Sequence, residues 1–226
     1  MSDTARIAVA GKKSGEGRVK APGAQPIVFV ISGPSGSGKS TLVQKLLDLP
    51  GTMFSISCTT RKPRPTENPG KWYDFVSEAE FDRLVRENAF LEYAQVFGRH
   101  RYGTPRKWLD LAQERGLDLV LEIDVQGAAS IRKQVPGAVT IFIVPPSREE
   151  LERRIRSRGQ DSEDEIARRL QQARKEMESF AVYDFIVVND DLERAGREVH
   201  AIGLGTRCRS SRARPVVERI LKTFGG

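Results

Sequence analysis

Short apolar, β-branched runs recur along the chain, and helical patterns separate them. Four runs read as buried strands: Ile27 to Ile31, Leu117 to Ile123, Ala138 to Val144 and Phe185 to Val188. The helical patterns cover residues 39–49, 125–134, 147–158, 162–180 and 192–202. Strands that alternate with helices predict βαβ units. We therefore expect an α/β fold, with a parallel sheet flanked by helices on both faces.

Three helix starts carry a capping box, in which a serine precedes a glutamate by three residues. The pairs are Ser77 with Glu80, Ser147 with Glu150, and Ser162 with Glu165. In this motif the serine side chain accepts from the backbone N–H three residues on, which fixes where the helix begins.

The stretch from Thr59 to Phe97 breaks this alternation. It opens with a turn-rich segment and continues with a strand-like run at residues 72–76, a helix, and another strand-like run at residues 90–97. We expect a small mixed α/β insertion, about residues 57–104, carried by a sheet domain that spans residues 26–202.

Composition narrows the class of protein. With 38% hydrophobic and 30% charged residues among 226, the chain is typical of a soluble globular domain. Its apolar runs are too short to cross a bilayer, and the start of the chain lacks the apolar stretch of a secretion signal. Two cysteines and two histidines exclude a disulfide framework and a His-rich metal site. We expect a cytoplasmic protein without a membrane partner.

The formal charge of +7 is concentrated in two short segments. Residues 1–25 hold five basic against two acidic side chains, and residues 203–214 hold four basic side chains and no acidic one. Both segments are rich in glycine and serine, which predicts a flexible basic tail and a basic linker. The remaining residues are balanced in charge, so we expect no nucleic-acid partner.

Apolar spacing after the linker predicts a C-terminal helix over residues 215–226. The pattern does not say whether this helix packs on its own core or on another subunit. A monomer and a homodimer both stay open.

Residues Gly33 to Ser40 read G-P-S-G-S-G-K-S and fit the phosphate-binding P-loop pattern. Its glycines let backbone N–H groups turn around a phosphate, and the helix that follows offers its positive end. Lys39 would reach the β- and γ-phosphates, and the Ser40 hydroxyl would bind Mg²⁺. The pattern predicts a nucleoside triphosphate site.

The P-loop alone does not name the reaction. Asp124 to Gly127 matches the D-x-x-G pattern of GTPases, but the chain has no N-K-x-D stretch to read guanine in a GTPase. A GTPase is therefore disfavoured.

The insertion suggests a second phosphorylated substrate. Arg61 and Arg64 lie three apart in a proline-stiffened turn. Arginine forks suit phosphate, and a carboxylate such as Glu92 can accept both N1–H and N2–H₂ of guanine. Taken alone, each of these charged residues would be interpreted as a solvent-exposed side chain of a loop. Together with a P-loop, they favour a binding site for a second phosphorylated substrate.

At this point the sequence resembles the guanylate kinases, over residues 27–202. The markers are G-P-S-G-S-G-K-S-T from Gly33, S-x-T-T-R-x-P-R from Ser57, F-L-E-Y-A-Q from Phe90, L-E-I-D-V-Q-G from Leu121, and V-N-D-D from Val188. The resemblance implies Mg²⁺-dependent, reversible phosphoryl transfer from ATP to GMP, and to dGMP as well, giving ADP and GDP in purine nucleotide recycling. It also implies a helical lid at about residues 147–170.

The resemblance assigns a role to each matched residue. ATP would be held by Gly33, Pro34, Ser35, Gly36, Ser37, Gly38, Lys39, Ser40 and Thr41, with Asn189 near the adenine or the lid hinge. Guanine would be surrounded by Ser57, Glu92, Thr104 and Asp124, and the GMP phosphate would be held by Arg61, Arg64, Tyr73 and Tyr102. The catalytic cations would be Lys39, Arg61, Arg154, Arg158 and Arg169.

Two carboxylates complete the prediction. Glu122 and Asp124 lie two apart, so they share one face near the carboxyl end of a predicted strand, where parallel sheets bind ligands. They could hold the waters of Mg²⁺ and orient GMP.

Two other classes stay in view. Some guanylate-kinase-like domains bind proteins without catalysis, but these typically have a degraded phosphate loop, and here the loop is intact. A kinase for another phosphorylated acceptor is the remaining alternative.

Overall fold

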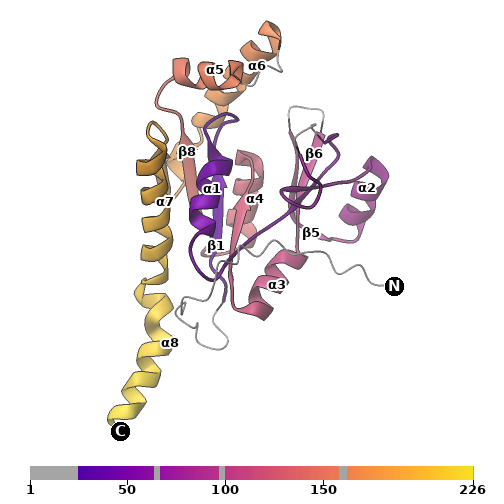
Figure 1. Ribbon diagram of the computed structural model, residues 1–226. Coiled ribbons are helices and arrows are strands. Elements are labelled where there is room, and N and C mark those ends of the chain that lie inside the picture. The colour runs from indigo at the N-terminus through magenta and orange to yellow at the C-terminus, as the bar shows by residue number, and fades with distance from the viewer. Residues whose placement is uncertain (1–24, 64–66, 97–99, 158–161, 226) are drawn as a thin grey trace.

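A computed structural model describes residues 25–63, 67–96, 100–157 and 162–225. Its main sheet is parallel throughout and confirms the α/β prediction (Figure 1). The strand order is β2 (Thr52–Phe54), β7 (Asp118–Glu122), β1 (Val28–Ser32), β8 (Val139–Val144) and β9 (Phe185–Val188). The central strand β1 is buried along its whole length, as expected of a parallel strand covered on both faces.

Helices cover both faces of this sheet. On one face, α1 (Lys39–Leu47) and α7 (Leu192–Arg207) enclose a core that includes Phe29, Ile31 and Val199. On the other face, α3 (Lys107–Arg115) and α4 (Val125–Gln134) enclose a core that includes Val30, Leu121 and Ile131. The alternating side chains of β1 thus feed two separate cores.

Serine caps start three helices where the sequence predicts them. Ser77, Ser147 and Ser162 each accept a hydrogen bond of 3.1–3.3 Å from the backbone N–H three residues on. They cap α2 (Glu78–Arg86), α5 (Arg148–Arg156) and α6 (Glu163–Met177). These local bonds satisfy N–H groups that the first turn of a helix leaves free.

The insertion forms a second, mixed sheet beside the main one (Figure 1). Its strand order is β4 (Tyr73–Phe75), β3 (Ser57–Thr59), β6 (His100–Pro105) and β5 (Phe90–Val96). Helix α2 packs on it through Phe81, which stacks on Phe90 at 4.7 Å between ring centroids. The small sheet therefore has its own apolar core. It lies beside the main sheet (Figure 1).

Helices α5 and α6 lie beyond the carboxyl end of the main sheet and pack on each other (Figure 1). Leu151, Ile155 and Ile166 form the core between them. The expected lid, residues 147–170, falls on this helix pair.

The prediction of a flexible linker at residues 203–214 is wrong. Helix α7 continues to Arg207, and α8 (Ser210–Leu221) begins five residues before the predicted start at residue 215. Close packing explains the glycine at position 203, and chain flexibility does not, since a Cβ there would lie 2.4 Å from Leu49 Cδ1. Arg207 Nε then donates to Asp118 Oδ2 at 2.9 Å, which ties the end of α7 to the sheet.

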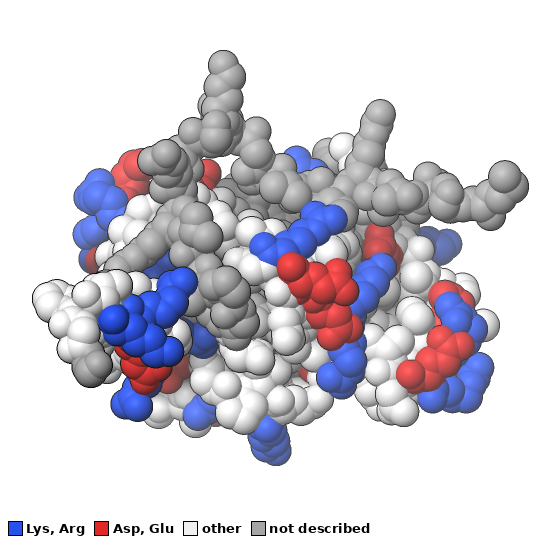
Figure 2. All heavy atoms as spheres, turned by 90° about the horizontal axis from the view of Figure 1, so that it is seen from below, with Lys and Arg blue, Asp and Glu red and all other residues white. Residues whose placement is uncertain are grey.

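Charge on the described surface is mixed. Figure 2 shows basic and acidic side chains interspersed on the face it presents. Within the described residues, the search for a helix long and apolar enough to cross a membrane finds none. The expected basic tail, residues 1–25, lies outside the described residues except for Gln25.

Candidate active site

The P-loop joins the end of β1 to the start of α1. Gly33 and Gly38 have φ angles of 137° and 92°, a region that side chains with a Cβ rarely adopt. A Cβ at Gly33 would lie 2.1 Å from the carbonyl oxygen of Ile143, and one at Gly38 would lie 2.2 Å from Asn189 Nδ2. The backbone of the loop is therefore fixed by close packing as well as by its own turns.

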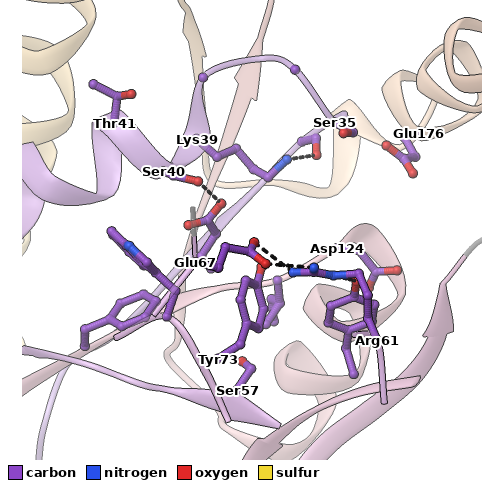
Figure 3. Close-up of a pocket in the computed structure, with 18 of the residues that line it drawn as sticks. Ser35, Lys39, Ser40, Thr41, Ser57, Arg61, Glu67, Tyr73, Asp124 and Glu176 are labelled. Atoms are coloured by element: carbon purple, nitrogen blue, oxygen red, sulfur yellow. Dashed lines mark hydrogen bonds and ion pairs between the residues drawn. The ribbon is translucent and has the colours of Figure 1, made fainter. Parts of the chain in front are cut away.

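Lys39 curls back over this loop (Figure 3). Its ammonium donates to the carbonyl oxygens of Gly33 at 2.6 Å and Pro34 at 3.0 Å. The next residue, Ser40, donates from its hydroxyl to Glu122 Oε1 at 2.7 Å. The structure thus brings together Ser40 and Glu122, two of the three residues expected around a metal.

Arg61 is the centre of a second cluster, on the small sheet. Its guanidinium donates to both carboxylate oxygens of Glu67, at 2.8 and 2.9 Å, and to the hydroxyl of Tyr102 at 3.2 Å. It also lies 5.5 Å from the ring centroid of Tyr73. Three of the four residues expected to hold the GMP phosphate are therefore together, and the fourth, Arg64, lies outside the described residues.

Glu92 lies on β5 with only 5% of its surface exposed. Thr104, on the neighbouring strand β6, donates its hydroxyl to Glu92 Oε1 at 2.6 Å. Burial raises the pKa of Glu92 to about 7, a rise that the negative Asp124 adds to and the Thr104 hydrogen bond opposes. A carboxyl group that titrates near neutral pH is typical of a ligand site.

Asp124 follows β7 and caps α4. Its Oδ1 accepts from the backbone N–H of Gly127 at 2.8 Å. Burial raises its pKa, while the N–H groups at the start of α4 lower it. Asp124 therefore caps α4 and also lines the cavity, and its role beside guanine or Mg²⁺ stays a prediction.

One cavity of about 580 Å³ joins the P-loop to the cluster on the small sheet. Its wall contains most of the predicted site residues: Gly33, Ser35, Gly36, Gly38, Lys39, Ser40, Thr41, Ser57, Arg61, Tyr73, Glu92, Tyr102, Glu122, Asp124 and Arg169. Thr104 lies behind this wall, against Glu92. Its volume lies in the range of small-molecule sites, and it faces a phosphate loop on one side and a buried carboxylate on the other.

The lid arginines hold the P-loop from its outer side. Arg154 donates to the carbonyl oxygen of Asn189 at 2.8 Å and to Glu150 at 2.7 Å, and Arg169 donates to the Ser35 hydroxyl at 2.9 Å. Arg158 lies outside the described residues. Arg154 keeps its ion pair with Glu150 while its Nη1 donates to the Ser37 carbonyl oxygen of the P-loop at 3.4 Å, and its role in a lid stays a prediction.

Asn189 lies behind the P-loop. Its side chain is buried and donates from Nδ2 to the carbonyl oxygen of Ser37 at 2.7 Å. Together with the Arg154 contact, this places Asn189 between the loop and helix α5, and its role near the adenine or the lid hinge stays a prediction.

Sequence reasoning missed two carboxylates in the cavity wall, Glu67 and Glu176. Glu67 lies in the turn-rich opening of the insertion, where a charge reads as solvated. Glu176 lies in an amphipathic helix rich in glutamate, where one more glutamate carries no signal. Among the described residues, no group of three or more His, Cys, Asp or Glu side chains could hold a metal by itself.

The fold and the cavity define the class of protein. A parallel sheet whose central strand runs through a P-loop into a helix, with Arg and Tyr side chains on another wall of the same cavity, is typical of a P-loop kinase. The family model described as "Guanylate kinase" matches residues 25–202. The chain belongs to the guanylate kinase family.

Individual relatives agree with this assignment. The chain is 45% identical over 197 residues to guanylate kinase from Caldanaerobacter subterraneus subsp. tengcongensis, covering 87% of this chain and 95% of that one. It is 47% identical over 192 residues to guanylate kinase from Escherichia coli K12, covering 84% and 92%. A crystal structure of guanylate kinase from Anaplasma phagocytophilum matches with a TM-score of 0.70 at 35% identity, covering 84% and 90%. The sequence-based prediction of a guanylate kinase is confirmed.

Proposed function

We propose that the protein transfers the γ-phosphoryl group of ATP to GMP, and also to dGMP, in a reversible, Mg²⁺-dependent reaction that recycles purine nucleotides. The observation that carries this proposal is that the P-loop and the Arg61–Glu92 region line one cavity. Transfer between two polyanions is limited by alignment and charge repulsion, which such a cavity addresses directly.

The triphosphate binds along the P-loop. Its backbone N–H groups and the N-terminal end of α1 receive the phosphates. Lys39 leaves the carbonyl oxygens of Gly33 and Pro34, which hold it at 2.6 and 3.0 Å, and neutralises charge on the γ-phosphoryl oxygens. The Lys39 ammonium thus already lies against the loop before the triphosphate binds.

Ser40 and Glu122 fit a magnesium ion. Both offer oxygen atoms, which Mg²⁺ prefers. Ser40 Oγ, at the start of α1, lies 2.7 Å from Glu122 Oε1, at the end of β7. When bound, Mg²⁺ would neutralise phosphate charge, with the Ser40 hydroxyl as a direct ligand and Glu122 and Asp124 holding its waters.

GMP binds on the small sheet. Arg61 releases the two hydrogen bonds that it donates to the Glu67 carboxylate and donates them to the GMP phosphate instead. A guanidinium can pair in this two-bond manner with either a carboxylate or a phosphate. Tyr73, Tyr102 and Arg64 complete the phosphate site. Glu92, ionised, accepts from guanine N1–H and N2–H₂, while Ser57, Thr104 and Asp124 surround the rest of the base.

Closure completes the site. Arg154 and Arg169 turn from their present contacts toward the moving phosphoryl group, Arg158 joins them there, and the small sheet swings inward with GMP. The site closes only when both ATP and GMP are bound, and this keeps water from attacking ATP.

The setting we propose is the reducing cytoplasm, where ATP and GMP occur and where the two free cysteines stay reduced. Within the proposal the protein acts as a monomer or a homodimer, without nucleic-acid or membrane partners.

A coupled assay of ADP formation tests the proposed function. Purified protein is given ATP and Mg²⁺ with GMP, dGMP, AMP, UMP or a ribose phosphate in turn. We expect turnover with GMP and dGMP and background rates with the others. Equal or higher turnover with another acceptor would overturn the proposal.

A further inference from the structure

Glu67 is a carboxylate in a cavity that the proposed function fills with two polyanions. It lines this cavity together with Arg61 and Tyr73, and its side chain is 20% exposed. A negative charge at this place repels an incoming phosphate group, so its presence needs a reason.

The Glu67 carboxylate pairs with Arg61 through two parallel hydrogen bonds. Arg61 Nη1 donates to Oε2 at 2.8 Å and Nη2 donates to Oε1 at 2.9 Å, and 14% of the Arg61 side chain is exposed. Figure 3 shows the two side chains meeting end to end. A guanidinium offers the same pair of donors to a phosphate. Glu67 therefore occupies the donors that Arg61 would offer to the phosphate of GMP.

Arg61 does not depend on Glu67 alone for its place in the cavity. Its Nε donates to the hydroxyl of Tyr102 at 3.2 Å, and its Nη1 also donates to the carbonyl oxygen of Lys62 at 2.8 Å. The guanidinium carbon lies 5.5 Å from the ring centroid of Tyr73, within the range of a cation–π contact. These contacts keep the guanidinium in the cavity when the carboxylate leaves it.

We propose that Glu67 is a resident anion that sets how tightly the site binds phosphate groups. In the free protein its carboxylate pairs with Arg61, and a phosphate group that binds there must first displace it. Inorganic phosphate gains only the contacts at Arg61 and its neighbours, so it competes poorly with the carboxylate. GMP gains the contacts between guanine and Glu92 as well, and these let it displace the carboxylate. The inference rests on the proposed function, because it assumes that the GMP phosphate binds at Arg61.

The size of the effect follows from the fraction of molecules in which Arg61 is available to a ligand. The apparent dissociation constant of a ligand equals its intrinsic value divided by this fraction. If Glu67 holds Arg61 in about nine-tenths of the molecules, every ligand with a phosphate group at this site binds about tenfold more weakly than it would otherwise. Guanosine has no phosphate group, so its binding does not depend on this fraction.

Two variants remove the resident anion, and a third is the matched control. Glu67→Gln keeps the shape of the side chain and removes its negative charge, whereas Glu67→Ala removes the whole carboxylate. The control is Glu80→Gln. Glu80 accepts from Nε and Nη2 of Arg83, at 2.8 and 2.6 Å, on the exposed surface of α2. The control variant therefore weakens the same kind of pair away from the cavity.

The test is calorimetry without ATP. It measures the dissociation constants of GMP and of guanosine, and it repeats the GMP titration over a series of inorganic phosphate concentrations. We expect GMP to bind about tenfold more tightly to both Glu67 variants than to the wild type, and guanosine to stay within about twofold. The phosphate concentration that doubles the apparent dissociation constant of GMP should be about tenfold lower in these variants. Glu80→Gln should match the wild type in all three measurements.

Three results would overturn the proposal. Weaker binding of GMP to the Glu67 variants would show that the carboxylate positions Arg61 for the phosphate. Unchanged affinities for GMP and inorganic phosphate would show that the pair does not limit binding. A gain for guanosine equal to the gain for GMP would mark a general change of the cavity. If one Glu67 variant does not fold, the other decides. Because these titrations measure binding without transfer, a wild type that binds GMP and does not phosphorylate it would overturn the proposed function and leave this comparison readable.

Discussion

The hydroxyl of Thr104 donates a 2.6 Å hydrogen bond to the carboxylate of Glu92, and both side chains are buried. The pair lies on adjacent strands β5 and β6, so pleat and register fix it. Thr104 occupies Oε1 and leaves Oε2 to other partners. The proposed function requires a carboxylate that accepts hydrogen bonds from guanine, and strand pairing and Thr104 already hold the Glu92 side chain in place.

The pKa of Glu92 predicts how GMP binding depends on pH. Only the ionised carboxylate accepts two hydrogen bonds from guanine, and in the free protein burial raises the pKa of this group to about 7. KM for GMP should therefore fall about tenfold between pH 6 and pH 8, since the ionised fraction rises by that factor. Steady-state kinetics measure this, with KM for ATP in the same buffers as the control. A flat KM for GMP would contradict it.

Glu92→Gln should separate binding from stability. The amide cannot accept from both guanine donors without presenting a donor of its own, so KM for GMP should rise more than KM for ATP and lose its pH dependence. In the wild type, the raised pKa means that Glu92 contributes its full stability below pH 4.5, and up to about 3 kcal/mol of this is lost as pH rises through 7. Glu92→Gln should therefore melt at a higher temperature than wild type at pH 8. Equal effects on the two KM values would remove Glu92 from the guanine site.

Lys39→Ala should abolish transfer without unfolding the protein. Lys39 contacts the loop through the carbonyl oxygens of Gly33 and Pro34 and belongs to none of the apolar cores of the described residues, so its loss acts on charge neutralisation. We expect kcat to fall at least about 100-fold, the effect of removing one donor to a developing oxyanion. Circular dichroism and thermal melting serve as the control for folding. Near-normal turnover would refute the role given to this lysine.

Gly127 makes room for Glu92. A Cβ at Gly127 would lie 2.7 Å from Glu92 Oε2, so Gly127→Ala must displace the carboxylate or helix α4. KM for GMP should rise about tenfold or more, with KM for ATP unchanged. Gly205→Ala is the matched control, because a Cβ at that helical glycine meets nothing within 4 Å. If both variants bind GMP like the wild type, the close approach has no role in base recognition.

Asp118 should govern stability without touching kinetics. It is fully buried at the start of β7, where it accepts from the Ile27 N–H and from Arg207 Nε, both at 2.9 Å. Asp118→Ala leaves a partly buried guanidinium and a buried N–H without this acceptor, which should cost about 3 kcal/mol. Glu114→Ala, an exposed change on α3, should cost less than about 0.5 kcal/mol. Denaturant unfolding compares the two, and equal stabilities would refute the anchoring role of Asp118.

The sequence predicts four of the five strands of the main sheet, because these strands are apolar, and it places the helices that carry caps. It misses the three-residue strands β2 and β3, which are too short for a pattern. It misses β6, since H-R-Y-G-T-P has no apolar alternation and is a strand through its pairing with β5 and β3. The error at residues 203–214 has the same kind of cause, because the close packing of Gly203 on Leu49 is tertiary. At the site, a motif marks the P-loop, whereas Glu176 joins the cavity wall through the packing of α6, which no local pattern encodes.

A crystal structure with ADP, Mg²⁺ and GMP tests the central claim most directly. We predict that the GMP phosphate lies within about 3 Å of the Arg61 guanidinium, which has left Glu67, and that guanine lies at the same distance from Glu92. A GMP molecule bound away from both Arg61 and Glu92 would contradict the account.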